Sequence, residues 1–362
     1  MGHHFLPTSI PASMSIENVF LDQTFQLYKA NGSPSASFIY GEEEEGEKEG
    51  FSTFLENFAK FLYNHLSRTN PSILQSTSEL ISSINDYKDL LRQLRVTKGR
   101  ESTERTGNEE ENEDANAPSY SMIFFSIRHS NLRILQKQSV VFITKREEQN
   151  QGQQNNLREE GKNFSTIVLV RASNPSISEG LLTVLEESVQ LGYPLVIKPE
   201  RISQGYIKDT INKMSEVKSV QEFGDVELSF QTSNIVGDSL RQVSVCIPQA
   251  DLERLNQVQQ RQQQEQLEQQ QQQQQQRNSE HQADPPTLPS AGPSLVAAIF
   301  SHLQKITALN LNLVPLSRFT SQIVNISQEG KIKIHRGIDG QNHEQIFSKS
   351  LVWRLLISLF NK

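Results

Sequence analysis

The sequence predicts an α+β protein with a mixed, largely antiparallel β-sheet, flanking helices, and disordered acidic and glutamine-rich insertions. Three observations support this class. Short β-prone runs recur along the chain, and several are joined by turn-forming residues, which favours hairpins. Helical segments with apolar residues at three- and four-residue spacing stand between these runs. Charged or glutamine-rich tracts interrupt both kinds of segment and hold too few apolar residues to join a core.

The N-terminal region, residues 20–96, is expected to contain one strand and two helices. The strand ends before a turn of sequence NGSP. Thr53 and Glu56 fit a capping box at the start of the first helix, and Pro71 is a residue favoured in the first turn of the second. These elements are expected at 20–28, 53–66 and 71–94.

Two acidic tracts determine the net charge of the chain. Residues 42–49 hold six Glu and one Lys, a charge of −5, and 101–114 hold seven acidic residues and Arg105, a charge of −6. The whole chain carries −7, so without these −11 units the remainder is at +4. We expect both tracts to be solvated, the second within a disordered acidic linker at 97–118, and residues 1–19 to be a disordered tail. The folded part is then mildly basic, which suits an acidic partner.

The central region, 119–255, is predicted to hold most of the strands. The first two are separated by a short polar turn and form a hairpin. The third is apolar at successive positions, as in a central strand, and a helix and a further strand follow it, which indicates a crossover unit. Cys246, in the last strand, is expected to be a partly buried packing residue rather than a nucleophile. Strands are expected at 121–127, 132–144, 165–171, 194–197, 226–230 and 240–247, with helices at 177–191 and 206–214.

The C-terminal part opens with a glutamine- and proline-rich segment, 256–293, that includes eight consecutive Gln. We expect it to be a disordered insertion, although Leu252, Leu255 and Leu267 are also compatible with an extended helix. The region 294–362 is expected to complete the sheet and to bind a partner. Its elements are expected to be helices at 295–309 and 344–359 and strands at 311–316, 320–327 and 331–336.

The usual catalytic motifs are missing from the sequence. It contains no Walker loop, no G-x-G-x-x-G after a strand, no G-x-S-x-G elbow and no H-E-x-x-H. One cysteine allows neither a disulfide within the chain nor a multi-cysteine zinc site, and a cytosolic or nuclear compartment fits best. We therefore expect no enzyme activity, no cofactor, no metal, no small-molecule substrate and no membrane span.

Two features of the C-terminal region suggest binding. On a strand, Lys331, Lys333 and His335 lie on one face and the intervening Ile332 and Ile334 on the other. Such a basic row suits phosphates, but it also suits the solvent-facing side of an amphipathic hairpin.

Trp353, off the main apolar stripe of the last predicted helix, suits either a partner anchor or the closure of the chain's own core.

Four segments together resemble the centromere protein L family of inner-kinetochore subunits, in its fungal form. LDQTFQLYKANGSP at 21–34 resembles the opening strand and turn of the family, and STIVLVRASNPSISEGLLTVLEE at 165–187 its central strand and helix. DSLRQVSVCIPQADLERL at 238–255 resembles a late strand and helix start. LNLVPLSRF at 311–319 and EGKIKI at 329–334 resemble the C-terminal hairpin.

The resemblance implies a non-catalytic nuclear protein at the centromere and kinetochore that acts in chromosome segregation. It implies a heterodimer with a centromere protein N homologue, contact with other inner-kinetochore subunits of the constitutive centromere-associated network, and weak or indirect contact with the centromeric nucleosome and its DNA. The pairing surface maps onto 311–336 and the last helix. The partner-binding residues implied by position are Leu311, Leu313, Leu316, Ile323, Trp353 and Leu356, and the DNA-proximal residues are Lys331, Lys333 and Arg336.

Two other function classes remain open from the sequence. A sequence-nonspecific nucleic-acid-binding protein that uses the basic hairpin predicts tight, salt-sensitive DNA binding by the isolated chain. A hydrolase with an unfamiliar site predicts a deep polar pocket with convergent titratable groups.

Overall fold

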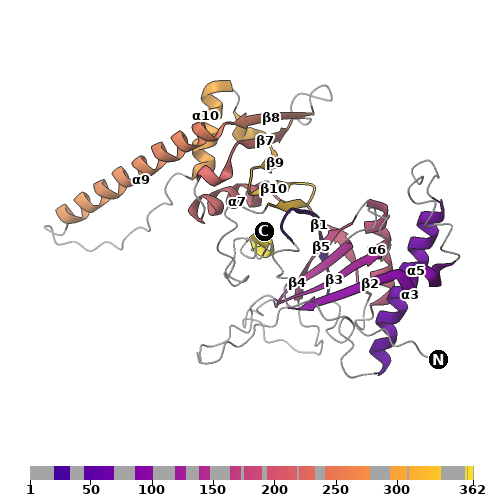
Figure 1. Ribbon diagram of the computed structural model, residues 1–362. Helices are drawn as coiled ribbons and strands as arrows, with labels where there is room; N and C mark the ends of the chain where they lie inside the picture. Colours follow the sequence, from indigo (N-terminus) through magenta and orange to yellow (C-terminus); the bar gives the residue numbers. More distant parts are fainter. Residues whose placement is uncertain are drawn as a thin grey trace. The chain divides into compact units, whose positions relative to one another are not determined.

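The computed structural model describes residues 20–32, 45–68, 86–100, 119–127, 138–146, 164–172, 175–189, 194–217, 220–232, 241–277, 294–307, 310–335, 355–356 and 358–361 (Figure 1). These residues belong to two compact units. Gln23–Arg201 forms the body of the first, and Ile202–Phe360 together with Phe20–Asp22 forms the second. The fold is of the α+β class, as predicted.

The first unit contains a six-stranded sheet with the order β2-β3-β4-β5-β1-β6, in which all neighbours are antiparallel. The predicted hairpin is confirmed, because β3 pairs with β4 over seven residue pairs. β5 is a central strand with its middle residues buried on both faces. The strands are β1 (Gln23–Ala30), β2 (Leu94–Arg100), β3 (Ser119–Ile127), β4 (Gln138–Arg146), β5 (Phe164–Arg171) and β6 (Ile197–Pro199).

The predicted crossover is also confirmed, with β1 inserted between its two strands. β5 and β6 both pair antiparallel with β1, so they run parallel to each other, and α6 (Pro175–Ser188) connects them. Asn31, just after β1, fastens the segment that leads into β6. Its side chain donates to the carbonyl of Pro194 (2.9 Å) and accepts from the N–H of Val196 (2.8 Å).

Three helices, α3 (Glu45–Arg68), α5 (Tyr87–Gln93) and α6, pack their apolar sides into the core of this unit. α3 contributes a row of aromatic rings in which Phe54 and Phe58 are fully buried and stacked, with centroids 6.1 Å apart. The short α5 begins at Asp86, whose carboxylate accepts from the N–H groups of Lys88 (2.8 Å) and Asp89 (3.0 Å).

The structure differs from the predicted boundaries at two places in this unit. α3 begins at Glu45, so the end of the acidic tract is helical and Thr53 lies inside the helix rather than at its cap. Acidic residues in a first helical turn are favoured by the helix dipole, which explains the earlier start. The helix expected to run to Leu94 ends at Gln93, and β2 then continues to Arg100, because it pairs with β3 at every residue. Thr97 to Arg100 are therefore strand, not disordered linker; Pro71 lies outside the described residues.

Replacing Thr53 with Ala tests the helix start. Because Thr53 is exposed and inside α3, the change should leave the free energy of unfolding unchanged or raise it by about 0.5 kcal/mol through better helix propensity. Loss of a true cap would instead cost about 1 kcal/mol. Urea denaturation measures the difference, and Ser52→Ala, equally helical and exposed, is the matched control. A loss of stability in Thr53→Ala that is absent in Ser52→Ala would instead support the capping box predicted from the sequence.

The second unit contains a five-stranded antiparallel sheet with the order β11-β10-β9-β7-β8. Helices α7 (Gln204–Val217) and α10 (Leu295–Thr307) pack on its apolar face, where the ring centroids of Phe300 and Phe230 lie 5.8 Å apart. The Asn212 side chain on α7 accepts from the N–H of Val296 (3.2 Å) and joins the two helices. The strands are β7 (Val226–Gln231), β8 (Gln242–Ile247), β9 (Leu316–Thr320), β10 (Val324–Ser327) and β11 (Lys331–Ile334).

The β10–β11 hairpin is present, but its first strand begins at Val324 rather than at residue 320, and the strand expected at 311–316 is not found. Leu311–Leu313 forms a 3-10 turn, η4, with Asn310 as its N-cap, and β9 starts at Leu316 after Pro315. The proline has no N–H to donate to a sheet, so the strand begins after it. A second 3-10 turn, η3 (Val220–Phe223), leads into β7.

A long helix replaces most of the expected glutamine-rich disorder. α9 (Gln249–Arg277) is continuous over 29 residues, and Figure 1 shows it extending well beyond the strands of its unit. Its first turn is anchored by fully buried Leu252 and by Asp225, whose carboxylate accepts from the N–H of Gln249 (2.9 Å). Glutamine is a good helix former, so the anchored start propagates through the polar tract. Residues 278–293 lie outside the described part of the chain.

Tyr206 on α7 fixes the last described segment to the second unit. Its hydroxyl donates to the carbonyl of Leu355 (2.7 Å), and the Ser358 hydroxyl lies 3.5 Å from it. Leu355, Leu356 and Leu359 are buried beside this contact, and η6 (Leu359–Asn361) follows. Burial raises the pKa of Tyr206 to about 12, and the hydrogen bond from Ser358 only partly opposes this.

Replacing Tyr206 with Phe should lower the free energy of unfolding by about 1–2 kcal/mol at pH 7, because the carbonyl of Leu355 loses a buried donor. The loss should shrink at high pH. The phenol pKa is raised in the folded state, so its contribution is complete below pH 10 and disappears as the pH rises toward 12. Urea denaturation at pH 7 and pH 11 measures both effects. A stability gap that stays constant between these pH values would contradict the buried, neutral phenol.

Candidate partner-binding surface

The sheet of the second unit has one apolar and one polar face, because side chains alternate along each strand. On the apolar face, Ile332, Ile326, Phe319 and Leu228 lie in one row across four strands and are at most 6% exposed. The opposite face, here called the polar face, carries two rows of side chains. The first row is Lys333, Asn325, Thr320, Glu227 and Cys246, and the second includes Ser327, Arg318, Ser229 and Ser244.

Short hydrogen bonds hold the small side chains of the polar face together. The hydroxyls of Ser229 and Ser244 lie 2.9 Å apart, and Ser317 donates to the carbonyl of Ser229 (3.0 Å). Thr320 donates to the side-chain oxygen of Asn325. Cys246 is exposed at the end of the first row, so the expectation of a packing residue was wrong: it lies on the outward face of the last strand.

The predicted basic row is present, but it carries fewer charges than the sequence suggested. Lys331 is exposed and forms an ion pair with Glu329 (3.0 Å), and Lys333 is half-buried. Burial, together with the charge of Lys333, lowers the pKa of His335, and Asp22, 3.9 Å away, only partly opposes this. His335 is therefore mostly neutral at pH 7.

Strand pairing adds one cation that sequence reasoning missed. Arg318 on β9 is exposed and lies opposite Ser327, on the same face as Lys333. Only the register of β9 against β10 reveals this neighbour. Arg336, the third predicted DNA-proximal residue, lies outside the described residues.

Most of the predicted partner-binding side chains lie inside the second unit. Leu311, Leu316, Ile323 and Leu356 are 2%, 0%, 6% and 1% exposed, so their side chains are accessible to a partner only if the unit rearranges. Leu313 is 73% exposed and is directly accessible. Trp353 lies outside the described residues. The assignment of these residues to a partner remains a prediction.

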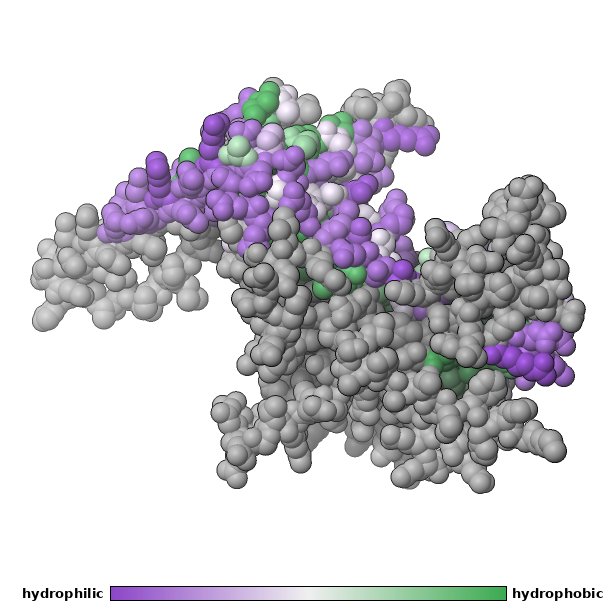
Figure 2. Space-filling view, viewed as in Figure 1, coloured by the Kyte–Doolittle hydropathy of each residue, from purple (hydrophilic) through white to green (hydrophobic). Residues whose placement is uncertain are grey.

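The structure reveals a second exposed apolar side chain next to η4. Ile306, in the last turn of α10, is 66% exposed, and α10 contacts η4, which carries Leu313. Figure 2 shows apolar surface in the part of the second unit where α10, β7 and β8 lie. We call Ile306 and Leu313 the exposed apolar pair. Large exposed side chains of this kind are typical of contact sites when they lie close together.

β8 is an open sheet edge. Within the described part of the chain it pairs only with β7. Natural edge strands are usually protected by a proline or an inward charge, and β8, with the sequence QVSVCI, has neither. Its free N–H and C=O groups are therefore suited to pairing with a strand of another chain.

The described residues contain no cluster of three or more His, Cys, Asp or Glu side chains that could hold a metal ion. None of the helices among them is both long and apolar enough to cross a bilayer.

Comparison with known proteins gives one result for this chain. No curated protein matches it. The family model described as "Centromere protein L" matches residues 181–362, half of the chain, and this span contains every strand of the second unit. The family is one of centromere and kinetochore proteins with a structural role. The chain therefore belongs to the centromere protein L family.

Proposed function

We propose that this protein is a non-catalytic structural subunit of the inner kinetochore that pairs with a centromere protein N homologue and so supports recognition of the centromeric nucleosome. The observation that carries the proposal is the family match over 181–362. The pairing itself goes beyond that match and rests on the surface features of the second unit.

Two features support a protein partner for the second unit. The open edge of β8 offers main-chain hydrogen bonds, which give affinity in strand addition. The exposed apolar pair offers side chains whose burial would be favourable, at about 25 cal/mol for each Å² removed from water. Leu313 belongs to both the predicted pairing surface and this pair, so we place the centre of the interface there.

Replacing the exposed apolar pair with Asp tests the interface without removing any part of the fold. We expect Ile306→Asp with Leu313→Asp to weaken binding to the centromere protein N homologue of the same organism at least tenfold, because charges would be desolvated at the interface. Isothermal titration calorimetry of the full chain measures this. Val196→Asp is the matched control, since Val196 is an exposed apolar residue (39%) of the first unit.

Three outcomes would contradict the proposal: no binding by the unmodified chain, unchanged binding by the double variant, or an equal loss in the Val196 control. Circular dichroism of each variant separates a lost contact from a lost fold.

A second candidate function is sequence-nonspecific nucleic-acid binding by the chain alone. Its support is the exposed or half-exposed cations Arg318, Lys331 and Lys333 on the polar face. Against it, Lys331 is paired with Glu329, and Glu227 lies in the same row as Lys333. We therefore expect DNA contact to be secondary to protein pairing.

Salt-dependent DNA binding distinguishes the two functions. We expect the isolated chain to bind duplex DNA only with the weak affinity of nonspecific complexes, about 10⁻⁴–10⁻⁶ M at physiological salt. Changing Arg318, Lys331 and Lys333 to Gln should reduce the slope of log K against log salt by up to about 3. Fluorescence anisotropy with a labelled duplex measures both, with Arg254→Gln on α9 as the control. Nanomolar binding that these changes abolish would favour the second function.

A further inference from the structure

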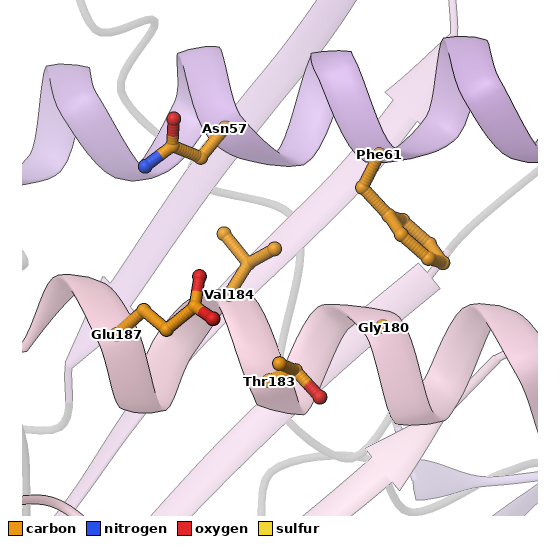
Figure 3. Close-up of a pocket in the computed structure, with 6 residues that line it drawn as sticks. All are labelled: Asn57, Phe61, Gly180, Thr183, Val184 and Glu187. Atoms are coloured by element: carbon orange, nitrogen blue, oxygen red, sulfur yellow. The ribbon is translucent and has the colours of Figure 1, made fainter.

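A pocket lies between two helices of the first unit. It has a volume of about 420 Å³ and opens to solvent between α3 and α6 (Figure 3). Phe61 and Val184 provide its apolar walls, and Asn57, Thr183 and Glu187 provide polar groups. The second unit, where we place the pairing surface, contributes none of these residues.

Gly180 on α6 allows Phe61 to occupy one end of the pocket. A Cβ atom built at Gly180 would lie 1.9 Å from the tip of the Phe61 ring, so no other residue fits there without moving the ring. Phe61 also stacks on Phe58 and His65, with centroids 6.4 and 5.8 Å away. The ring is thus held in place as a partly buried wall of the pocket.

Glu187 is an exposed carboxylate that lines the pocket. It lies in the last turn of α6, where the negative end of the helix dipole disfavours a carboxylate. Its neighbour Glu186 has a structural role, since it accepts from the N–H of Ile197 at the start of β6. No described residue forms a hydrogen bond or ion pair with Glu187, and Figure 3 shows its carboxylate directed into the space between the helices.

The charged residues in and around the pocket indicate that it favours a cationic ligand. Glu187 is the only charged residue among those that line it, and α6 contains three Glu and no Lys or Arg. On α3, the nearby charges of Glu56 and Lys60 form an ion pair with each other (2.8 Å). The charged end of a cationic ligand would therefore lie beside the Glu187 carboxylate, with no lysine among the lining residues to repel it. An apolar stem of the same ligand would contact Phe61 and Val184.

We infer that this pocket binds an arginine side chain presented by a partner protein. The guanidinium group pairs with a carboxylate through parallel hydrogen bonds, and the aliphatic stem covers the apolar wall. This partner would contact the first unit and is separate from the centromere protein N homologue proposed for the second.

NMR titration of the full chain with N-acetyl-arginine methylamide tests the pocket. We expect saturable shifts of the Gly180, Thr183 and Val184 amides in the millimolar range. The citrulline analogue, which has the same shape but no charge, should bind at least fivefold more weakly. Glu187→Gln should cause the same fivefold loss, and Glu179→Gln, an exposed Glu on the same helix outside the pocket, should cause none.

A 15-residue alanine-based peptide with one central arginine tests the protein partner. It should shift the same amides and bind more tightly than the arginine analogue. Binding of the analogue but not of the peptide would overturn the protein partner in favour of a small cation. No saturable shift, equal binding of citrulline, or an equal loss in Glu179→Gln would overturn the site itself. None of these readouts depends on the pairing of the second unit.

Discussion

The pairing of β1 is the constraint on which the first unit depends. Gln26 to Ala30 pair with Val170 to Thr166 of β5, and Tyr28 to Ala30 also pair with β6 on the opposite edge. The strand that comes first in the chain thus holds together two strands that come much later. Without β1, β5 and β6 have no common neighbour, and α6 has no continuous sheet on which to pack. Contacts this distant in sequence are costly in loop entropy, so the apolar core they enclose has to compensate for that cost.

Strand register in the second unit and helix packing in the first bring together the residues of the interaction surfaces. In the second unit, register places Arg318 and Lys333 on one face and the large apolar side chains on the other. In the first unit, the approach of α3 and α6 at Gly180 leaves a pocket beside Phe61. Each surface combines residues from segments that are separate in the chain. This organisation is compatible with membership of a centromere and kinetochore protein family.

In the isolated chain, the open edge of β8 and the exposed apolar side chains favour unwanted association with other molecules. β8 carries no charge or proline to prevent association, and Ile306 and Leu313 are largely exposed. A partner that pairs with this edge would satisfy its main-chain groups and bury the apolar pair at the same time. The features that weaken the second unit as an isolated protein are thus the ones that a stable partner would use.

The sequence alone determined the elements whose pattern is local. The alternation in the β10–β11 hairpin, the apolar run of β5 and the stripe of α10 each appear within a few residues, and all three form as predicted. The resemblance in ordered segments also identified the family.

Tertiary structure decided everything that depends on distant neighbours. β2 is a strand because β3 pairs with it, although its own sequence is polar. Leu316 is buried and Leu313 exposed, although both are apolar residues of one segment, because only Leu316 faces the packed side of the sheet. Arg318 and the pocket at Glu187 had no signal in the sequence. Local patterns are set by adjacent residues, whereas burial and the meeting of side chains are set by pairings between residues far apart in the chain.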